Sequence, residues 1–280
     1  MPAPRAACSI LLALMLTFFA GGVAGSETDF SSTRGQVNHG IGADQQALNI
    51  NAEQSTNWSG YGITGGPLGF TSVQGTWSVP AVPGTKKDTA SSTWAGIGGN
   101  CTDSSCTGQD PTLIQAGTEQ DSSAGKPTYY AWWEAIPAPS VQAGGVLSSQ
   151  TYPVRPGDAV TVKIDVANGA VWTIEITDMR AGHQRWTFST TVPYSAAGLT
   201  AEWIEEAPLT AGTGGAGQIA LSNFHRVGFG GLTANGNNPH LRGSEAIVLV
   251  GSSGQAIARP SAPKASGNAF SICWGSGPCP

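Results

Sequence analysis

Glycine and proline interrupt this chain at short intervals, and the segments between them have the length and composition of β-strands. Gly accounts for 39 of the 280 residues and Pro for 18. The intervening segments are rich in Val, Ile, Thr and aromatic residues, and none shows a sustained helical repeat of apolar positions. An Asn168-Gly169 pair between two of them is a strong signal for a tight hairpin. The pattern predicts an all-β fold of two large antiparallel sheets packed face to face, with strands at 58–63, 70–79, 92–97, 112–119, 128–136, 159–166, 171–178, 184–190, 201–206, 224–232 and 245–250.

Charged side chains are scarce. They make up 11% of the residues, against roughly 25% in an ordinary soluble protein, and this excludes a coiled coil. Hydrophobic residues at 40% and nine Trp provide a core, which excludes a charge-driven disordered chain. The net charge is −5, and the 13 basic residues form no cluster, so nucleic acid is not expected as a partner.

The N-terminus has the three parts of a secretory signal. Arg5 precedes an apolar run at 10–20, and small residues follow it up to Ser26. We expect a signal peptide at 1–25, a propeptide or flexible leader at 26–54, and one folded domain at 55–280. The apolar run is too short for a membrane-spanning helix. The protein is therefore expected to be secreted and extracellular, with no membrane partner.

Four cysteines remain after the signal, an even number in an oxidising compartment. They allow three pairings. Their close spacing favours two local disulfides, Cys101–Cys106 and Cys273–Cys279. A zinc site needs pairs closer together, with a suitable ligand set. No metal is therefore expected.

The motifs of several common hydrolases are missing from the sequence. There is no Gly-x-Ser-x-Gly elbow and no His-Glu-x-x-His pair. None of the four histidines stands in the sequence context of a serine or cysteine triad. Any hydrolytic chemistry is therefore expected to rely on carboxylates and amides.

Two strand segments place such groups together. Within 201–206, alternation puts Glu202 on one face and Glu205 on the other. Within 112–119, Gln115 and Glu119 share a face, with Gly117 between them leaving space for a ligand backbone. Each segment has a plain structural alternative, namely an edge strand with solvated glutamates and a Gln that satisfies hydrogen bonds on a sheet.

A third segment, 129–137, combines aromatic side chains with a carboxylate. Trp132 and Glu134 share a face in the predicted strand. Such an aromatic platform binds sugars or extended peptides, but it can equally fill the core of a sandwich.

Taken in order, eight short blocks resemble the eqolisins, a family of glutamic peptidases. They cover residues 57 to about 250, and their order along one chain makes the resemblance specific although each is weak alone. The blocks are NWSGY at 57–61, GTWSVP at 75–80, WAGI at 94–97, LIQAG at 113–117, YYAWWEAIP at 129–137, PGD at 156–158, AEWIE at 201–205 and NF at 223–224.

The resemblance implies a concanavalin-like β-sandwich of two bent sheets that acts as an acid endopeptidase with no cofactor. It places the catalytic Gln at Gln115 and the catalytic Glu at Glu202. Trp94 is expected to line the substrate cleft, and an acidic residue four after the Gln is kept as Glu119. We add Trp132 and Glu134 as expected substrate-binding residues. Polypeptide substrates and a monomeric enzyme are expected.

Two other functions remain open from the sequence. A glycoside hydrolase would pair Glu134 with Glu202 as its two carboxylates. A lectin-like binding module would use the aromatic face without any chemistry. Gln115 separates these readings, because a Gln/Glu dyad requires it and a glycosidase gains nothing specific from it.

Overall fold

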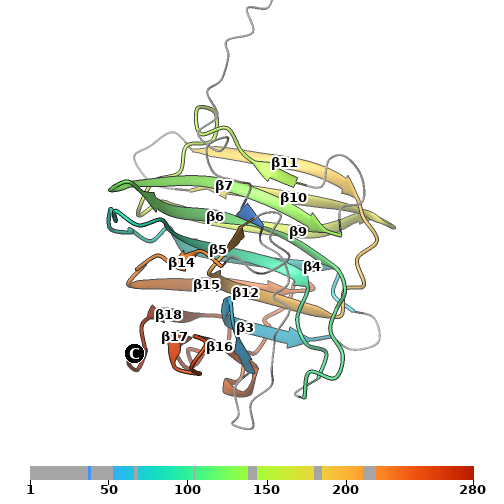
Figure 1. Ribbon diagram of the computed structural model, residues 1–280. Helices are drawn as coiled ribbons and strands as arrows, with labels where there is room; N and C mark the ends of the chain where they lie inside the picture. Colours follow the sequence, from blue (N-terminus) through green and yellow to red (C-terminus); the bar gives the residue numbers. More distant parts are fainter. Residues whose placement is uncertain are drawn as a thin grey trace, which may run out of the picture.

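Antiparallel strands account for nearly all of the regular structure in the computed structural model of the chain (Figure 1). The structure describes residues 37–38, 53–65, 69–103, 105–137, 144–179, 185–210 and 218–280. Within these ranges the strands are β1 (Val37–Asn38), β2 (Glu53–Ser55), β3 (Trp58–Thr64), β4 (Ser72–Ser78), β5 (Thr89–Gly98), β6 (Leu113–Ser123), β7 (Lys126–Ile136), β8 (Gly144–Val146), β9 (Ala159–Asn168), β10 (Val171–Asp178), β11 (Trp186–Pro193), β12 (Thr200–Glu206), β13 (Leu209–Thr210), β14 (Ala220–Leu221), β15 (Arg226–Ala234), β16 (Ala246–Val250), β17 (Ala256–Pro260) and β18 (Phe270–Trp274).

All eleven predicted strands are present, with ends that differ by a few residues. The prediction missed the short strands β1, β2, β8, β13 and β14, and it also missed β17 and β18. Only five residues long, β17 ends in Pro260, which gives a weak strand signal. Gly243–Glu245 forms a short 3₁₀ turn before β16.

Hydrogen bonding links the strands into one long ladder that folds over on itself. Its order is β11-β10-β9-β4-β15-β18-β17-β16-β3-β12-β5-β6-β7-β8. The first layer runs from β11 to β15 and the second from β3 to β8, and β18, β17 and β16 carry the ladder around the bend. The two predicted sheets are therefore the layers of one continuous, bent sheet (Figure 1).

The core lies between the two layers. Along β9, Val160, Val162 and Ile164 are buried while the residues between them are not, as the alternation predicts. Two indoles cross the interface with their N–H groups satisfied. Trp77 donates to Thr118 Oγ1 at 3.0 Å, and Trp203 donates to the backbone oxygen of Gln74 at 2.8 Å. These bonds fix the stacking of the layers, because a buried indole N–H without a partner is costly.

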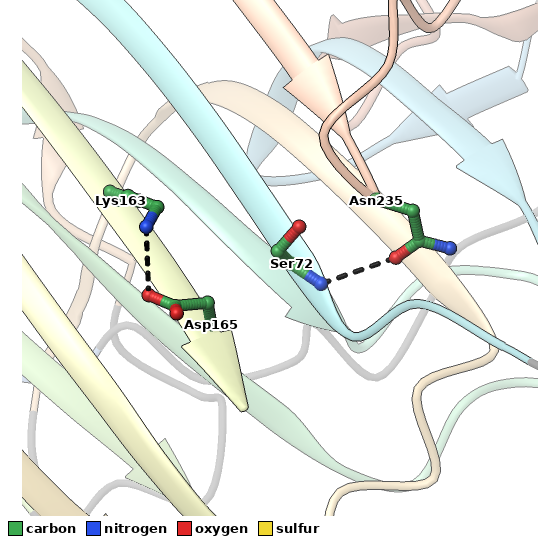
Figure 2. Close-up of polar contacts among 4 residues, drawn as sticks. All are labelled: Ser72, Lys163, Asp165 and Asn235. Carbon is green, nitrogen blue, oxygen red and sulfur yellow. Dashed lines mark hydrogen bonds and ion pairs between the residues drawn. The ribbon is translucent and has the colours of Figure 1, made fainter. Parts of the chain in front are cut away.

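Polar side chains make further contacts on strands of the first layer. The side-chain oxygen of Asn235 accepts a hydrogen bond from the backbone N–H of Ser72 at 3.2 Å and ties the end of β15 to the start of β4 (Figure 2). On the neighbouring strand, Lys163 and Asp165 form an ion pair at 3.4 Å (Figure 2). Both side chains are well exposed, so the pair contributes little to stability.

The two predicted disulfides are confirmed. Cys101–Cys106 closes a short loop after β5, and Cys273–Cys279 holds the C-terminal tail against β18.

The predicted signal peptide lies outside the described residues, as does most of the predicted leader. The described part of the leader forms β1, which pairs with β13, and β2, which pairs in parallel with β16. The sheet thus begins at Glu53, two residues before the predicted start of the domain. In the part of the chain that the structure describes, no helix is long and apolar enough to cross a membrane.

Candidate active site

The outer face of the second layer is buried over its middle strands β12, β5 and β6, which is unusual for an antiparallel sandwich. Such a sheet commonly packs one face on the core and leaves the other in water, and its strands then alternate between buried and exposed residues. Every residue of β12 is buried, whichever face of the strand it lies on. All but one residue of β5 and all but one of β6 are buried as well. Carboxylates and amides that point away from the core are therefore enclosed as well.

The strand register aligns the main polar groups in one row across this face. Glu202 on β12 is opposite Gly96 on β5, and Gly96 is opposite Gln115 on β6. Gln115 is in turn opposite Glu134 on β7. Because cross-strand neighbours project from the same face, three chemical side chains converge on one line. We call this line the Glu202–Glu134 row.

Gly96 lies between Glu202 and Gln115 in this row. The α-carbons of these two residues are two strand spacings apart, or roughly 10 Å. A Cβ on Gly96 would lie 3.0 Å from Trp94 Cζ3 and 3.1 Å from Gln115 Cβ, so the position has little space for a side chain. The bare backbone thus separates a carboxyl from an amide, and the edge of the Trp94 ring lies beside it.

Trp94 is held in place by a carboxylate one row further away. Its indole N–H donates to Glu206 Oε2 at 2.8 Å, and Asn57 Nδ2 donates to Glu206 Oε1 at 3.2 Å. The ring of Trp58 meets that of Trp94 edge-on, with centroids 5.0 Å apart. Glu206, which has no predicted role, here anchors the Trp94 indole.

Trp132 and Glu119 lie on the same face, beyond the Glu202–Glu134 row. Trp132 is in the row of Trp94, and its indole donates to Ser92 Oγ at 3.0 Å. Glu119 is fully buried one row further along. Burial and the charge of Asp121 raise the pKa of Glu119 well above its usual range. Glu119 therefore stays protonated and neutral in acid.

Asn100 is a neighbour of Glu202 that the sequence analysis did not single out. Its Nδ2 lies 2.1 Å from where a Cβ on Gly62 would be, and Gly62 is the cross-strand partner of Glu202. The side chain of Asn100 therefore fills the place beside Glu202 that a larger residue at Gly62 would take. A glycine inside the strand at 58–64 was the available signal, because such glycines often mark close approach of another group.

The structure thus brings together every residue predicted for the site. Gln115, Glu202 and Glu134 share one row, Trp94 and Trp132 share the next, and Glu119 lies in the third. Both Gln115 and Glu202 are fully buried. Across the described ranges, no group of three or more His, Cys, Asp or Glu side chains is arranged to hold a metal ion.

Glu205 is on the opposite face of β12, inside the core. Its Oε2 accepts a hydrogen bond from Thr93 Oγ1 at 2.5 Å, and the residue is fully buried. Burial raises the pKa of Glu205 to about 8, although hydrogen bonds from Thr93 and Ser91 oppose the rise. Glu202 and Glu205 therefore lie on opposite faces of β12, as the alternation predicts.

We expect the fold to lose stability as the pH rises from about 4.5 to about 8. In this range Glu205 is protonated in the folded state and ionised in the unfolded state, so the folded state binds the extra proton and rising pH favours unfolding. At about 1.4 kcal/mol per pKa unit, the loss is on the order of 4 to 5 kcal/mol. Urea unfolding at several pH values measures it.

The matched variant is Glu205→Gln, which keeps the shape of the side chain but does not titrate. It should flatten the decline, although Glu119 contributes in the same direction and leaves a residual slope. An unchanged slope in a folded Glu205→Gln variant would show that this carboxyl does not govern stability.

The fold is a bent antiparallel sandwich, and one face of its second layer carries a carboxyl and an amide on either side of a glycine. Residues 56–271 match the model of the peptidase A4 family. This match covers well over half of the chain, which therefore belongs to that family, the eqolisins, and is a glutamic endopeptidase.

Solved structures with the same fold agree. A crystal structure of scytalido-glutamic peptidase with a transition-state analogue inhibitor has a TM-score of 0.60 and 20% sequence identity, covering 79% of this chain and 99% of the other. SCP-B, a member of the eqolisin family in complex with the tripeptide Ala-Ile-His, has a TM-score of 0.54 and 19% identity over the same shares. Aspergilloglutamic peptidase from Aspergillus niger has a TM-score of 0.50 and 20% identity, covering 67% of this chain and 99% of the other. No curated protein sequence matches the chain.

Proposed function

We propose that this enzyme is a secreted acid endopeptidase in which Glu202 is the general base and acid and Gln115 stabilises the oxyanion. The observation that most supports the proposal is the Glu202–Glu134 row, in which Glu202 and Gln115 flank Gly96 on one face. A peptide bond above Gly96 would have a carboxyl on one side and an amide on the other.

The reaction follows from what these two groups can do. Ionised Glu202 takes a proton from a water molecule, and the water oxygen attacks the carbonyl carbon of the scissile bond. The carbonyl oxygen becomes an oxyanion, to which the amide N–H of Gln115 donates a hydrogen bond. Protonated Glu202 then gives its proton to the amide nitrogen as the carbon–nitrogen bond breaks. The products are a carboxylic acid and an amine, and Glu202 is ionised again.

We propose that the enzyme is active in acid because its general base is a glutamate. A glutamate titrates near pH 4.3 in model peptides, so it exchanges protons readily at about pH 3 to 4, where a histidine base is already protonated. The stability provided by Glu205 is complete in the same range. Both features fit an acidic medium, and the proposed reaction needs no cofactor.

Export and processing are proposed from the N-terminal sequence. A signal at 1–25 would direct secretion, and removal of 26–54 would leave the domain at 55–280. N-terminal sequencing of active protein from the culture medium should find a start between about Ser26 and Asn57. A start beyond Trp58 would remove the first strand residue of β3 and contradict the domain boundary.

The order of residues in the Glu202–Glu134 row gives less support to the glycosidase alternative. Glu134 and Glu202 are three strand spacings apart, or roughly 14 Å between α-carbons, with Gln115 between them. Paired glycosidase carboxyls lie about 5 to 9.5 Å apart. The row therefore favours a dyad of Glu202 with Gln115.

Digestion of denatured casein at about pH 3 to 4, with and without pepstatin, tests the proposed function. We expect cleavage that pepstatin does not block, because the proposed dyad has no pair of aspartates. A panel of β-glucans assayed in parallel should remain intact. Glucan cleavage without casein cleavage would overturn the proposal.

A further inference from the structure

The Trp94 indole reaches from Glu206 to the Glu202–Glu134 row. At one end, its Nε1–H donates to Glu206 Oε2 at 2.8 Å. At the other end, its Cζ3 lies 3.0 Å from the position that a Cβ on Gly96 would take. The two atoms belong to different rings of the fused indole, so a bond that fixes Nε1 also fixes the ring edge beside Gly96.

The acceptor of the Trp94 N–H differs in kind from those of other buried indoles. Trp203 donates to a backbone oxygen and Trp132 to the hydroxyl of Ser92, and both acceptors are neutral. Trp94 donates to a carboxylate, which is a stronger acceptor. The Trp58 ring also meets the Trp94 ring edge-on, with centroids 5.0 Å apart. The orientation of Trp94 is therefore fixed both by a hydrogen bond and by a packed ring.

Glu206 is itself held by residues of β2 and of the turn into β3. Asn57 Nδ2 donates to Glu206 Oε1 at 3.2 Å, and Ser55 Oγ donates to Asn57 Oδ1 at 3.1 Å. Ser55 Oγ also accepts a hydrogen bond from the backbone N–H of Trp58 at 3.0 Å. Ser55, Asn57 and Glu206 are all buried. A continuous chain of hydrogen bonds thus runs from Ser55 through Glu206 to Trp94.

We propose that Glu206, supported by Asn57, is a positioning residue that orients the Trp94 ring against the bound peptide. This inference rests on the proposed function, in which the scissile bond lies above Gly96. Trp94 then contacts the peptide beside that bond without touching the reacting atoms, so it binds the ground state and the transition state alike. Loss of such a contact raises KM and leaves kcat nearly unchanged.

The same chain of hydrogen bonds links peptide binding to processing of the N-terminus. Removal of Ser55 would take away the group that donates to Asn57 and accepts from the Trp58 N–H. It would also remove the last residue of β2 that pairs with β16. The mature enzyme therefore keeps Ser55, and protein that starts after this residue binds peptides more weakly.

The kinetics of Glu206→Gln on a soluble peptide test this proposal. A glutamine amide has one oxygen, so it can accept from Trp94 or from Asn57, but its NH₂ group then faces the other donor. KM should rise about tenfold, while kcat stays within about threefold of the parent. Glu175→Gln on β10, in the other layer, is the matched control and should keep both parental constants.

A reciprocal exchange should restore the orientation of the ring. In the double variant Glu206→Gln with Asn57→Asp, the amide and the carboxylate change places. The new amide donates to the new carboxylate, and its oxygen still accepts from the Trp94 N–H. Ser55 Oγ keeps an acceptor as well. KM should return to within about threefold of the parent.

A merely structural role for Glu206 would lower the amount of folded enzyme, which lowers the apparent kcat and leaves KM unchanged. The proposal requires both the rise in KM and its reversal in the double variant, and the absence of either in folded protein would overturn it. Asn57→Ala removes one contact to the carboxylate and should also raise KM, so it provides the test if Glu206→Gln does not fold.

Failure of the dyad is a separate result, because Glu202→Gln would then remain active. If Glu202→Gln is inactive while folded Glu206→Gln keeps the parental KM, the dyad stands and the positioning role falls.

Discussion

Glu202→Gln is expected to reduce the cleavage of denatured casein at about pH 3 to 4 to background. The substitution keeps the size of the side chain and its capacity for hydrogen bonds, but an amide cannot accept the proton of the attacking water at these pH values. The loss should be on the order of 10²- to 10⁴-fold in kcat. The measurement is the rate of release of acid-soluble peptides.

The matched control lies three residues away on the same strand. Glu205→Gln makes the same chemical change on the core face of β12, and Glu205 is already protonated in acid, so the variant should keep measurable turnover. Near-UV circular dichroism must show that both variants are folded, since Glu202 is next to the core residue Trp203. A folded Glu202→Gln variant that still cleaves casein, beside a folded Glu134→Gln variant that does not, would move the catalytic carboxyl to β7.

Gln115→Ala should lower kcat by on the order of 10²- to 10³-fold, the usual effect of removing one oxyanion donor. KM should change less, because the donor acts mainly on the transition state. Gln115→Glu is the sharper variant. The new carboxyl, the third in the Glu202–Glu134 row, repels Glu202 when both ionise and raises the pKa of one of the two, so any remaining activity should follow a shifted pH profile. Activity of Gln115→Ala within a few-fold of the parent would contradict the oxyanion role.

Local alternation was enough to predict most of the fold. The clean alternation of β9 identifies its buried face, and the Asn168-Gly169 pair identifies the turn to β10, because these signals depend only on neighbouring residues. The junction of the layers was not predictable in this way. The strands β16, β17 and β18 follow one another in the sequence, but the junction depends on the pairing of β16 with β3 and of β18 with β15, which are far apart in the sequence. The short β17 also gives little local signal.

The residues of the candidate site could be proposed from the sequence, but their arrangement could not. Alternation places Glu202 on one face of its strand and Gln115 on one face of another, yet only the register of β12, β5 and β6 shows that Gly96 separates them. The roles of Asn100 and Glu206 depend on contacts over 38 residues or more of sequence. No local sequence pattern predicts such contacts. The burial of both dyad residues is likewise a property of the assembled sheet.

The most direct test of the central claim is a crystal structure of the mature enzyme with a peptide in which a tetrahedral hydroxyl replaces the scissile carbonyl. The account predicts that this hydroxyl lies above Gly96, within hydrogen-bond distance of the Glu202 carboxyl and of the Gln115 amide nitrogen. A hydroxyl bound elsewhere on the face, such as beside Glu119 and Asp121, with Glu202 and Gln115 making no contact to it, would contradict the account.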